Sequence, residues 1–167
     1  MAIKNEKRVQ DIFVTAVKKG LVKTSNNNAA LRGKWEIEKE TKPRGEYGWD
    51  VILTRGRRRL YLEVKCTSEG NRDSKFTKAM SAILFRKKPD SYSLRKASYG
   101  FVFNRGKKRK QGEGVYFDDY VKRRIMRDKR SKLAWGVMAK KFNAKYVFVI
   151  DDKTAKVVCY DWSKFVR

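Results

Sequence analysis

The sequence predicts an α/β fold in which amphipathic helices and β-rich runs share one apolar core. Two observations lead to this prediction. Of the 167 residues, 41% are apolar and 13% are aromatic, which suits a folded globule better than a disordered tail. The apolar residues also recur with two spacings, one typical of helices and one typical of strands. A chain of this length is expected to fold as one domain, residues 1–167.

The first half of the chain predicts a helix, three strands and a second helix. Apolar residues recur at helical spacing over residues 5–18, and Gly20 offers a stop. Trp35 and Ile37 alternate with glutamates, which suits a half-buried strand. Two β-rich runs follow, and the RGRR between them has Gly56 available for a hairpin turn. The expected elements are a helix over 5–18, strands over 34–40, 49–54 and 59–67, and a helix over roughly 75–88 capped by Asp73 or Ser74.

The second half predicts one more strand, a long helix and a closing pair of strands. RGKKRKQGEG, residues 105–114, is a basic, glycine-containing stretch that we expect to be a mobile loop. Residues 117–142 have a helical pattern of apolar positions, with Asp118 as the cap. That pattern consists of Val121, Ile125, Leu133, Val137 and Met138. The expected strands are residues 99–104, 145–150 and 156–162, the last two joined by a DDKT turn.

The net charge limits the kinds of partner that this protein can have. The chain has 43 Lys and Arg against 18 Asp and Glu, a formal charge of +25. Such a charge destabilises the compact state by self-repulsion, which points to a polyanionic partner. Nucleic acid is the leading candidate, because neutralising its phosphates releases condensed counterions. The basic residues are spread along the chain instead of gathering on one amphipathic helix, so we expect DNA and no membrane as the partner.

Histidine is absent, which excludes many kinds of chemistry. No histidine base or ligand is available, so His-dependent nucleases and Ser-His or Cys-His hydrolases are ruled out. Cys66 and Cys159 lie in apolar strand-like runs and are expected to be buried thiols, since two cysteines alone cannot build a zinc site. The N-terminus lacks an apolar signal region and no stretch approaches 18 apolar residues, so a cytoplasmic protein is expected.

Two carboxylates interrupt the β-rich hairpin. Asp50 and Glu63 are separated by twelve residues, so antiparallel pairing across a tight turn would place them opposite each other. Glu63 and Lys65 leave the same face of their strand. Two neighbouring carboxylates repel each other unless a cation lies between them, and oxygen ligands of this type favour Mg²⁺ or Mn²⁺. The carbonyl of Val64 is a natural additional metal ligand.

These residues resemble a known family. The pattern WD-x12-EVK is similar to the motif of the PD-(D/E)XK nucleases, and the stretch WDVILTRGRRRLYLEVKCT resembles the hairpin of archaeal-type Holliday-junction resolvases. Trp49 stands where the family motif has proline. The resemblance implies a mixed central sheet flanked by helices, with a restriction-endonuclease-like αβββαβ core over about residues 1–104. The basic C-terminal extension, about residues 105–167, matches nothing in that family.

The resemblance also implies an activity and its residues. The family cleaves DNA phosphodiesters with a divalent metal, so Asp50 and Glu63 would be metal ligands and Lys65 the catalytic lysine. An N-terminal glutamate often completes the site, and Glu6 is the best match. The sequence leaves four competitors for this place, Glu36, Glu38, Glu40 and Glu46. It also leaves open whether Lys75 and Lys78, on the next helix, face the site.

Two classes of function therefore compete. The first is a Mg²⁺-dependent DNA endonuclease, either structure-selective, acting as a homodimer on junctions, or a site-specific enzyme of a phage or mobile element. The second is a non-catalytic, basic nucleic-acid-binding protein with a structural acidic hairpin. In either case, the residues expected to contact phosphates are Arg57, Arg58, Arg59, Lys107, Lys108, Arg109 and Lys110. Trp35, Trp135 and Trp162 are expected to be core residues.

Overall fold

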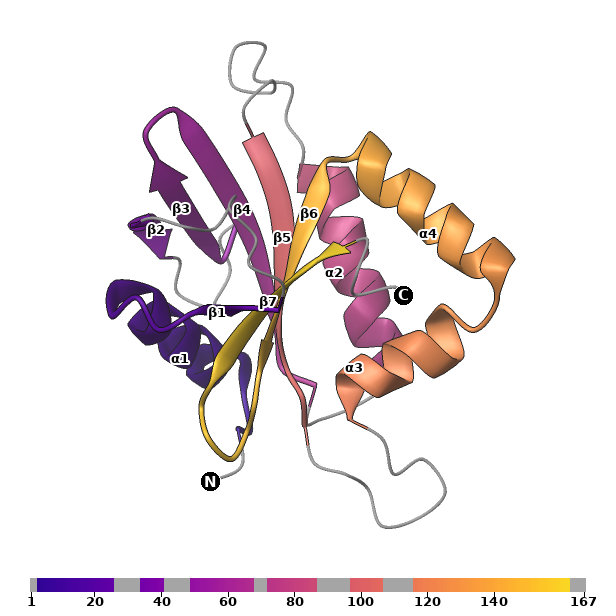
Figure 1. Ribbon diagram of the computed structural model, residues 1–167, viewed down its shortest axis with the longest axis horizontal. Coiled ribbons are helices and arrows are strands. Elements are labelled where there is room, and N and C mark those ends of the chain that lie inside the picture. Colours follow the sequence, from indigo (N-terminus) through magenta and orange to yellow (C-terminus); the bar gives the residue numbers. More distant parts are fainter. Residues whose placement is uncertain are drawn as a thin grey trace.

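The computed structural model describes residues 3–25, 34–40, 49–67, 72–86, 97–106 and 116–162 (Figure 1). The elements of the first half are α1 (Glu6–Lys18), β1 (Lys23–Thr24), β2 (Glu36–Glu40), β3 (Val51–Arg55), β4 (Arg58–Lys65), α2 (Arg72–Arg86) and β5 (Ala97–Asn104). The second half contains α3 (Phe117–Tyr120), the π-helical segment η2 (Val121–Ile125), α4 (Lys129–Lys141), β6 (Ala144–Ile150) and β7 (Val157–Asp161). The predicted α/β class is confirmed.

The strands form one mixed sheet of seven strands in the order β1-β7-β6-β5-β4-β3-β2. β2, β3 and β4 are antiparallel neighbours, whereas β4, β5 and β6 run parallel. β7 returns antiparallel to β6, and β1 pairs parallel with β7. The strands after residue 105 therefore extend the same sheet that the first half begins.

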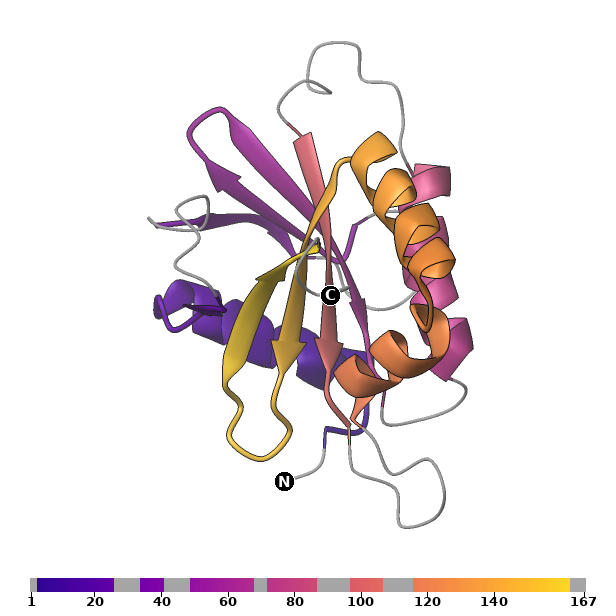
Figure 2. The same cartoon turned by 45° about the vertical axis from the view of Figure 1, so that its right-hand side comes forward.

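The helices cover opposite faces of this sheet. α1 lies on one face, and α2, α3 and α4 lie on the other, as both views show (Figures 1 and 2). The side chains of β4 follow this division. Leu60, Leu62 and Val64 belong to the apolar cluster under α1, whereas Tyr61 packs against the cluster under the other helices. Because side chains alternate along a strand, Glu63 points to the same face as Tyr61.

Local sequence signals account for the ends of α1. The Asn5 side chain caps the helix by accepting a hydrogen bond from the N–H of Arg8 at 2.8 Å. Val9 and Phe13 are fully buried, and the Phe13 ring meets Phe148 of β6 edge-on at 4.9 Å. Gly20, with a φ of +65°, ends the helical run in the left-handed conformation that glycine adopts easily. This packing places the first turn of α1 near the end of β4.

The long helix expected over residues 117–142 is wrong. α3 passes into the π-helical segment η2, and the helical conformation ends around Met126. α4 then begins as a separate helix, capped by the Asp128 side chain, which accepts a hydrogen bond from the N–H of Ser131. Leu133 and Val137, expected in the core, are 69% and 57% exposed. The break changes the helical phase, so the apolar positions on its two sides no longer share a face.

Smaller expectations differ as well. Asp118 does not cap α3: the cap position is Tyr116, and Asp118 lies in the first turn, with its carboxylate 3.1 Å from Arg105. α2 begins at Arg72, earlier than expected, and the short β1 was not foreseen. Cys66 and Cys159 are buried free thiols, as predicted. Trp162 is a core residue, and Trp35 and Trp135 pack half-buried against the two apolar clusters. No helix within the described ranges is long and apolar enough to cross a membrane.

Candidate active site

The hairpin register brings Asp50 to the end of β4. Val51 faces Leu62 and Arg55 faces Arg58, with the turn closed by Gly56 at a φ of +56°. Asp50 precedes β3 by one residue and so lies across from Glu63, as the spacing predicted. Its Oδ2 atom accepts a hydrogen bond from the backbone N–H of Val64 at 2.7 Å. This register is strongly specified, because a slip by one residue would turn every side chain of the strand to the other face of the sheet.

Glu63 and Lys65 form a buried ion pair. Glu63 is 1% exposed, and its Oε1 lies 2.7 Å from the Lys65 Nζ. The same ammonium donates to the carbonyl oxygen of Val64 at 2.9 Å. A carboxylate buried this deeply is costly unless it is paired, and Lys65 supplies the pairing charge from two residues along the strand.

Glu6 reaches the same ammonium from α1. Its Oε2 lies 3.7 Å from the Lys65 Nζ. Of the five glutamates that the sequence left in competition, Glu6 is therefore the one placed at this site. Glu38 pairs with Arg59 at 3.0 Å, and Glu36 is exposed on β2. The Glu40 side chain and Glu46 lie outside the described part of the chain.

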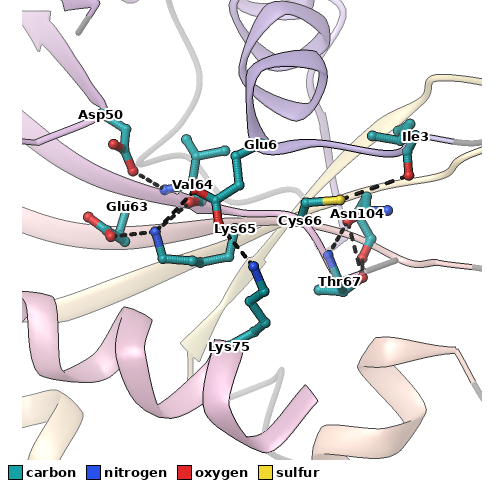
Figure 3. Close-up of polar contacts among 10 residues, drawn as sticks. All are labelled: Ile3, Glu6, Asp50, Glu63, Val64, Lys65, Cys66, Thr67, Lys75 and Asn104. Atoms are coloured by element: carbon teal, nitrogen blue, oxygen red, sulfur yellow. Dashed lines mark hydrogen bonds and ion pairs between the residues drawn. The ribbon is translucent and has the colours of Figure 1, made fainter. Parts of the chain in front are cut away.

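Lys75 enters the cluster from α2. Its Nζ lies 3.3 Å from the Glu6 Oε1, so the Glu6 carboxylate bridges two ammonium groups. Figure 3 shows Glu6 coming from α1 and Lys75 from α2, on opposite sides of β4, to meet beside Lys65. Lys78, one turn further along α2, is exposed to solvent. We call Glu6, Asp50, Glu63, Lys65 and Lys75 the acidic cluster, because it holds three carboxylates against two ammonium groups.

The surroundings keep Lys65 charged. Burial by itself lowers the pKa of Lys65. The charge and hydrogen bond of Glu63, followed by the charges of Glu6 and Asp50, outweigh that effect, so the pKa lies above its ordinary value. Lys65 is therefore a hydrogen-bond donor at neutral pH and not a base.

The donors in this cluster have the chemistry that a hard divalent cation prefers. Carboxylate and backbone carbonyl oxygens are the usual ligands of Mg²⁺ and Mn²⁺. In this structure the oxygens of Glu63, Val64 and Glu6 converge on a cation already, the Lys65 ammonium. Among the described residues no group of three or more His, Cys, Asp or Glu side chains is spaced to hold a metal ion. The donor types thus fit the ion, and the Lys65 ammonium would have to leave this position to admit it.

Two supporting contacts were missed from the sequence. The Gln10 amide nitrogen donates to the Asp50 carbonyl at 3.2 Å, one helical turn after Glu6. A polar residue on the buried face of α1 was the available signal. Beyond β4, the N–H and hydroxyl of Thr67 donate to the Asn104 side-chain oxygen at 2.7 and 3.1 Å, and the Asn104 amide donates to Asp152 at 2.8 Å. Figure 3 shows the contacts between Thr67 and Asn104. Together with the bond to Asp152, they tie the end of β4 to β5 and to the β6–β7 turn.

The predicted phosphate contacts lie elsewhere. Arg57, Arg58 and Arg59 are exposed at the turn end of the hairpin. From Arg58 to Glu63 the strand rises about 16 Å, so these arginines are remote from the acidic cluster. The basic residues 107–110, together with residues 111–114 of the expected mobile loop, lie outside the described residues.

Comparison of the chain with models of known families, with curated proteins and with solved structures gives no match in any of the three. The functional argument therefore rests on the geometry of the acidic cluster.

Proposed function

We propose that this protein is a divalent-metal-dependent DNA endonuclease that hydrolyses phosphodiester bonds with a PD-(D/E)XK-type site. The observation that carries the proposal is the meeting of Asp50, Glu63, Lys65 and Glu6 at one end of the sheet. Glu63 is 1% exposed with Lys65 at 2.7 Å, and Glu6 arrives from a helix 57 residues earlier in the chain. Ionisable side chains from separate segments that meet at one point, one of them with a shifted pKa, are typical of functional sites.

The topology supports this proposal. Apart from the two-residue β1, the order α1, β2, β3, β4, α2, β5 is the αβββαβ order of a restriction-endonuclease-like core. The hairpin β3–β4 is antiparallel, β4–β5 is parallel, and β5 begins after the α2 crossover. In this view the C-terminal strands and α4 are additions to that core.

The roles of the residues follow from their donors. Asp50, Glu63 and the Val64 carbonyl would hold Mg²⁺ or Mn²⁺, with Glu6 facing them. When bound, such an ion lowers the pKa of a coordinated water and offsets charge on a phosphate. Lys65 carries a proton at neutral pH, so it would donate a hydrogen bond to the attacking water or to the phosphate as negative charge grows there. The Val64 N–H fixes the Asp50 carboxylate, so the ligand is oriented before substrate arrives.

A second function is favoured by one observation. Lys65 satisfies Glu63 and the Val64 carbonyl together, which is also how a purely structural ion pair would be built. The alternative is a non-catalytic basic protein that binds nucleic acid through its charge.

One panel separates the two functions. Supercoiled plasmid, single-stranded DNA and a four-way junction are incubated with the protein in Mg²⁺, in Mn²⁺ and in EDTA, beside the Asp50→Asn variant. The endonuclease cuts at least one substrate only with metal, and the variant does not cut. Binding to all three without cutting in either metal would establish the alternative. Paired cuts across the junction, together with a dimer mass by sedimentation, would sharpen the proposal to a homodimeric junction resolvase.

A further inference from the structure

Lys75 is bound in the acidic cluster through a partner that the proposed metal would take away. Its Nζ lies 3.3 Å from Glu6 Oε1, while the other oxygen of the same carboxylate lies 3.7 Å from Lys65. The Lys75 side chain is 28% exposed, more than the 13% of Lys65. Lys75 is therefore the more accessible to solvent of the two lysine side chains in the cluster.

The position of Lys75 is fixed by its neighbour. Phe76 is buried in the apolar cluster beneath α2, with its ring 5.1 Å from Trp135 of α4. Ala79 and Met80, one turn on, are buried in the same cluster. The helix therefore cannot rotate freely, and Lys75 keeps its aim at the end of β4 whichever group it pairs with.

The charge balance indicates which group would pair with Lys75 once the proposed metal is bound. A divalent ion held by Asp50, Glu63 and the Val64 carbonyl would bring two positive charges into a volume that already holds two ammonium groups beside the three carboxylates. Glu6 would then face the metal, and Lys75 would be left close to a like charge. An incoming anion restores the balance, and a phosphodiester supplies one negative charge on two non-bridging oxygens.

We propose that Lys75 forms a phosphate-binding subsite beside the acidic cluster, in which a non-bridging oxygen of the DNA phosphate replaces Glu6 as its partner. This inference rests on the proposed function, because the exchange is driven by metal binding. It assigns the substrate class of the subsite, a phosphodiester and not a base, so the contact is independent of sequence. Lys75 would be unavailable to DNA without metal and available with it.

The test asks whether the contribution of Lys75 to DNA affinity depends on metal. Lys75→Met is compared with Lys78→Met, a matched loss of one charge from an exposed position on the same helix. Affinity for a labelled DNA duplex is measured by fluorescence anisotropy in Ca²⁺, which takes the same oxygen ligands, and in EDTA. We expect Lys75→Met to lose affinity on the order of tenfold in Ca²⁺, as for a charge-assisted hydrogen bond, and about as little as Lys78→Met in EDTA. Lys75→Arg should restore most of the affinity in Ca²⁺.

Thermal unfolding of each variant confirms that the fold is retained before affinities are compared. Equal losses for Lys75→Met and Lys78→Met in both buffers would overturn the subsite. So would a wild-type affinity that does not respond to metal.

The two proposals fail separately. A protein that cuts DNA while Lys75→Met behaves as Lys78→Met remains an endonuclease without this subsite. A protein that cuts none of the panel yet shows the metal-conditional loss keeps the phosphate subsite and is no endonuclease.

Discussion

Arg105, Tyr116, Asp118 and Asp151 form a second charged group, which we call the Arg105 cluster. Like the acidic cluster, it joins a cation to carboxylates of other segments, but the bonding differs. Arg105 donates from Nε and Nη2 to the two oxygens of Asp118 at 3.1 and 3.2 Å, with its guanidinium 4.1 Å from the centre of the Tyr116 ring. Asp151, 3.8 Å from the same guanidinium, accepts from the N–H groups of Lys153 and Thr154. The carboxylates of Asp118 and Asp151 thus accept hydrogen bonds from guanidinium and backbone N–H groups, whose directions are fixed by planar geometry.

At the acidic cluster one ammonium is shared. The Lys65 ammonium contacts oxygens of Glu63, Val64 and Glu6. The Glu6 carboxylate in turn contacts the ammonium groups of both Lys65 and Lys75. A lysine ammonium is a compact charge with three rotatable donors and no preferred fork, whereas an arginine fork holds one geometry. The difference teaches that the arginine fork fixes one geometry in the Arg105 cluster, whereas in the acidic cluster ammonium groups and a carboxylate are each shared between partners. Arg105→Lys in the one cluster should act mainly on stability, and Asp50→Asn in the other should act mainly on activity.

The largest effect is expected from Asp50→Asn. The amide can still accept from the Val64 N–H, so the free energy of unfolding should change by less than about 1 kcal/mol. The lost charge should lower the single-turnover cleavage rate on the order of 10³-fold or more, while DNA binding stays equal or tightens. Cleavage rate, filter binding and urea unfolding check the three parts. A variant that cuts at the wild-type rate in Mg²⁺ would remove Asp50 from the site.

Lys65→Ala should follow in size. We expect a fall in cleavage rate on the order of 10²–10³-fold, because a donor aimed at the developing charge is lost. Affinity for DNA should change less than about twofold, since one lysine among 43 basic residues adds little to total phosphate neutralisation. Single-turnover rates at saturating protein separate the two quantities. A loss confined to affinity would place Lys65 among ordinary phosphate contacts.

Arg105→Lys should act on stability instead. The charge is kept but the two-pronged contact with Asp118 is lost, so the free energy of unfolding should fall by about 1 kcal/mol. Cleavage per folded molecule should be unchanged. Urea unfolding beside the cleavage assay measures both. If Arg105→Lys slows cleavage at full folding, the comparison between the clusters fails.

Asp151→Asn should give the smallest effect, and one that depends on pH. The hydrogen bond from the Thr154 N–H, followed by other donors, holds the pKa of Asp151 below its ordinary value. A lowered carboxylate pKa contributes stability that is present above the ordinary value of about 3.9 and is lost as the pH falls through the folded-state value. The variant should therefore be about 0.5 kcal/mol less stable than wild type at pH 7, and this difference should shrink as the pH falls below the ordinary carboxylate pKa. Urea unfolding at a series of pH values measures the difference, and a difference independent of pH would contradict the assignment.

The hairpin and its carboxylates were predictable because local rules fix them. Gly56 sets the turn, alternation of apolar residues sets the register, and the register puts Asp50 across from Glu63. Nothing local chooses Glu6 over Glu38. That choice depends on how α1 packs through Phe13 against β6, and such a contact joins residues 135 apart in the chain.

The C-terminal half shows where local rules fail. Leu133 and Val137 fit the helical period that Val121 begins, yet only Val121 is buried. The capping residue that starts a new helix, Asp128, was visible in the sequence, but an acidic residue among lysines and arginines also reads as a solvated charge. Lys75 was a candidate from its place after the hairpin. Its pairing with Glu6 follows from two helices on opposite faces of the sheet, which no spacing encodes.

The labelling rates of the two buried thiols report local opening of the fold. Cys66 lies in the apolar cluster under α1, directly after the strand that carries the acidic cluster, and Cys159 lies in β7, nearer the edge of the sheet. Burial raises the pKa of Cys159, so its reactive thiolate is scarce while the chain is folded. Alkylation of each thiol therefore requires an opening fluctuation, and the two rates report different ones. Cys159 should be modified when the edge frays, whereas Cys66 should be modified when the segment around Ile3 and the end of β4 separate. The ratio of the two labelling rates measures how far the edge moves independently of the strand that holds Glu63 and Lys65.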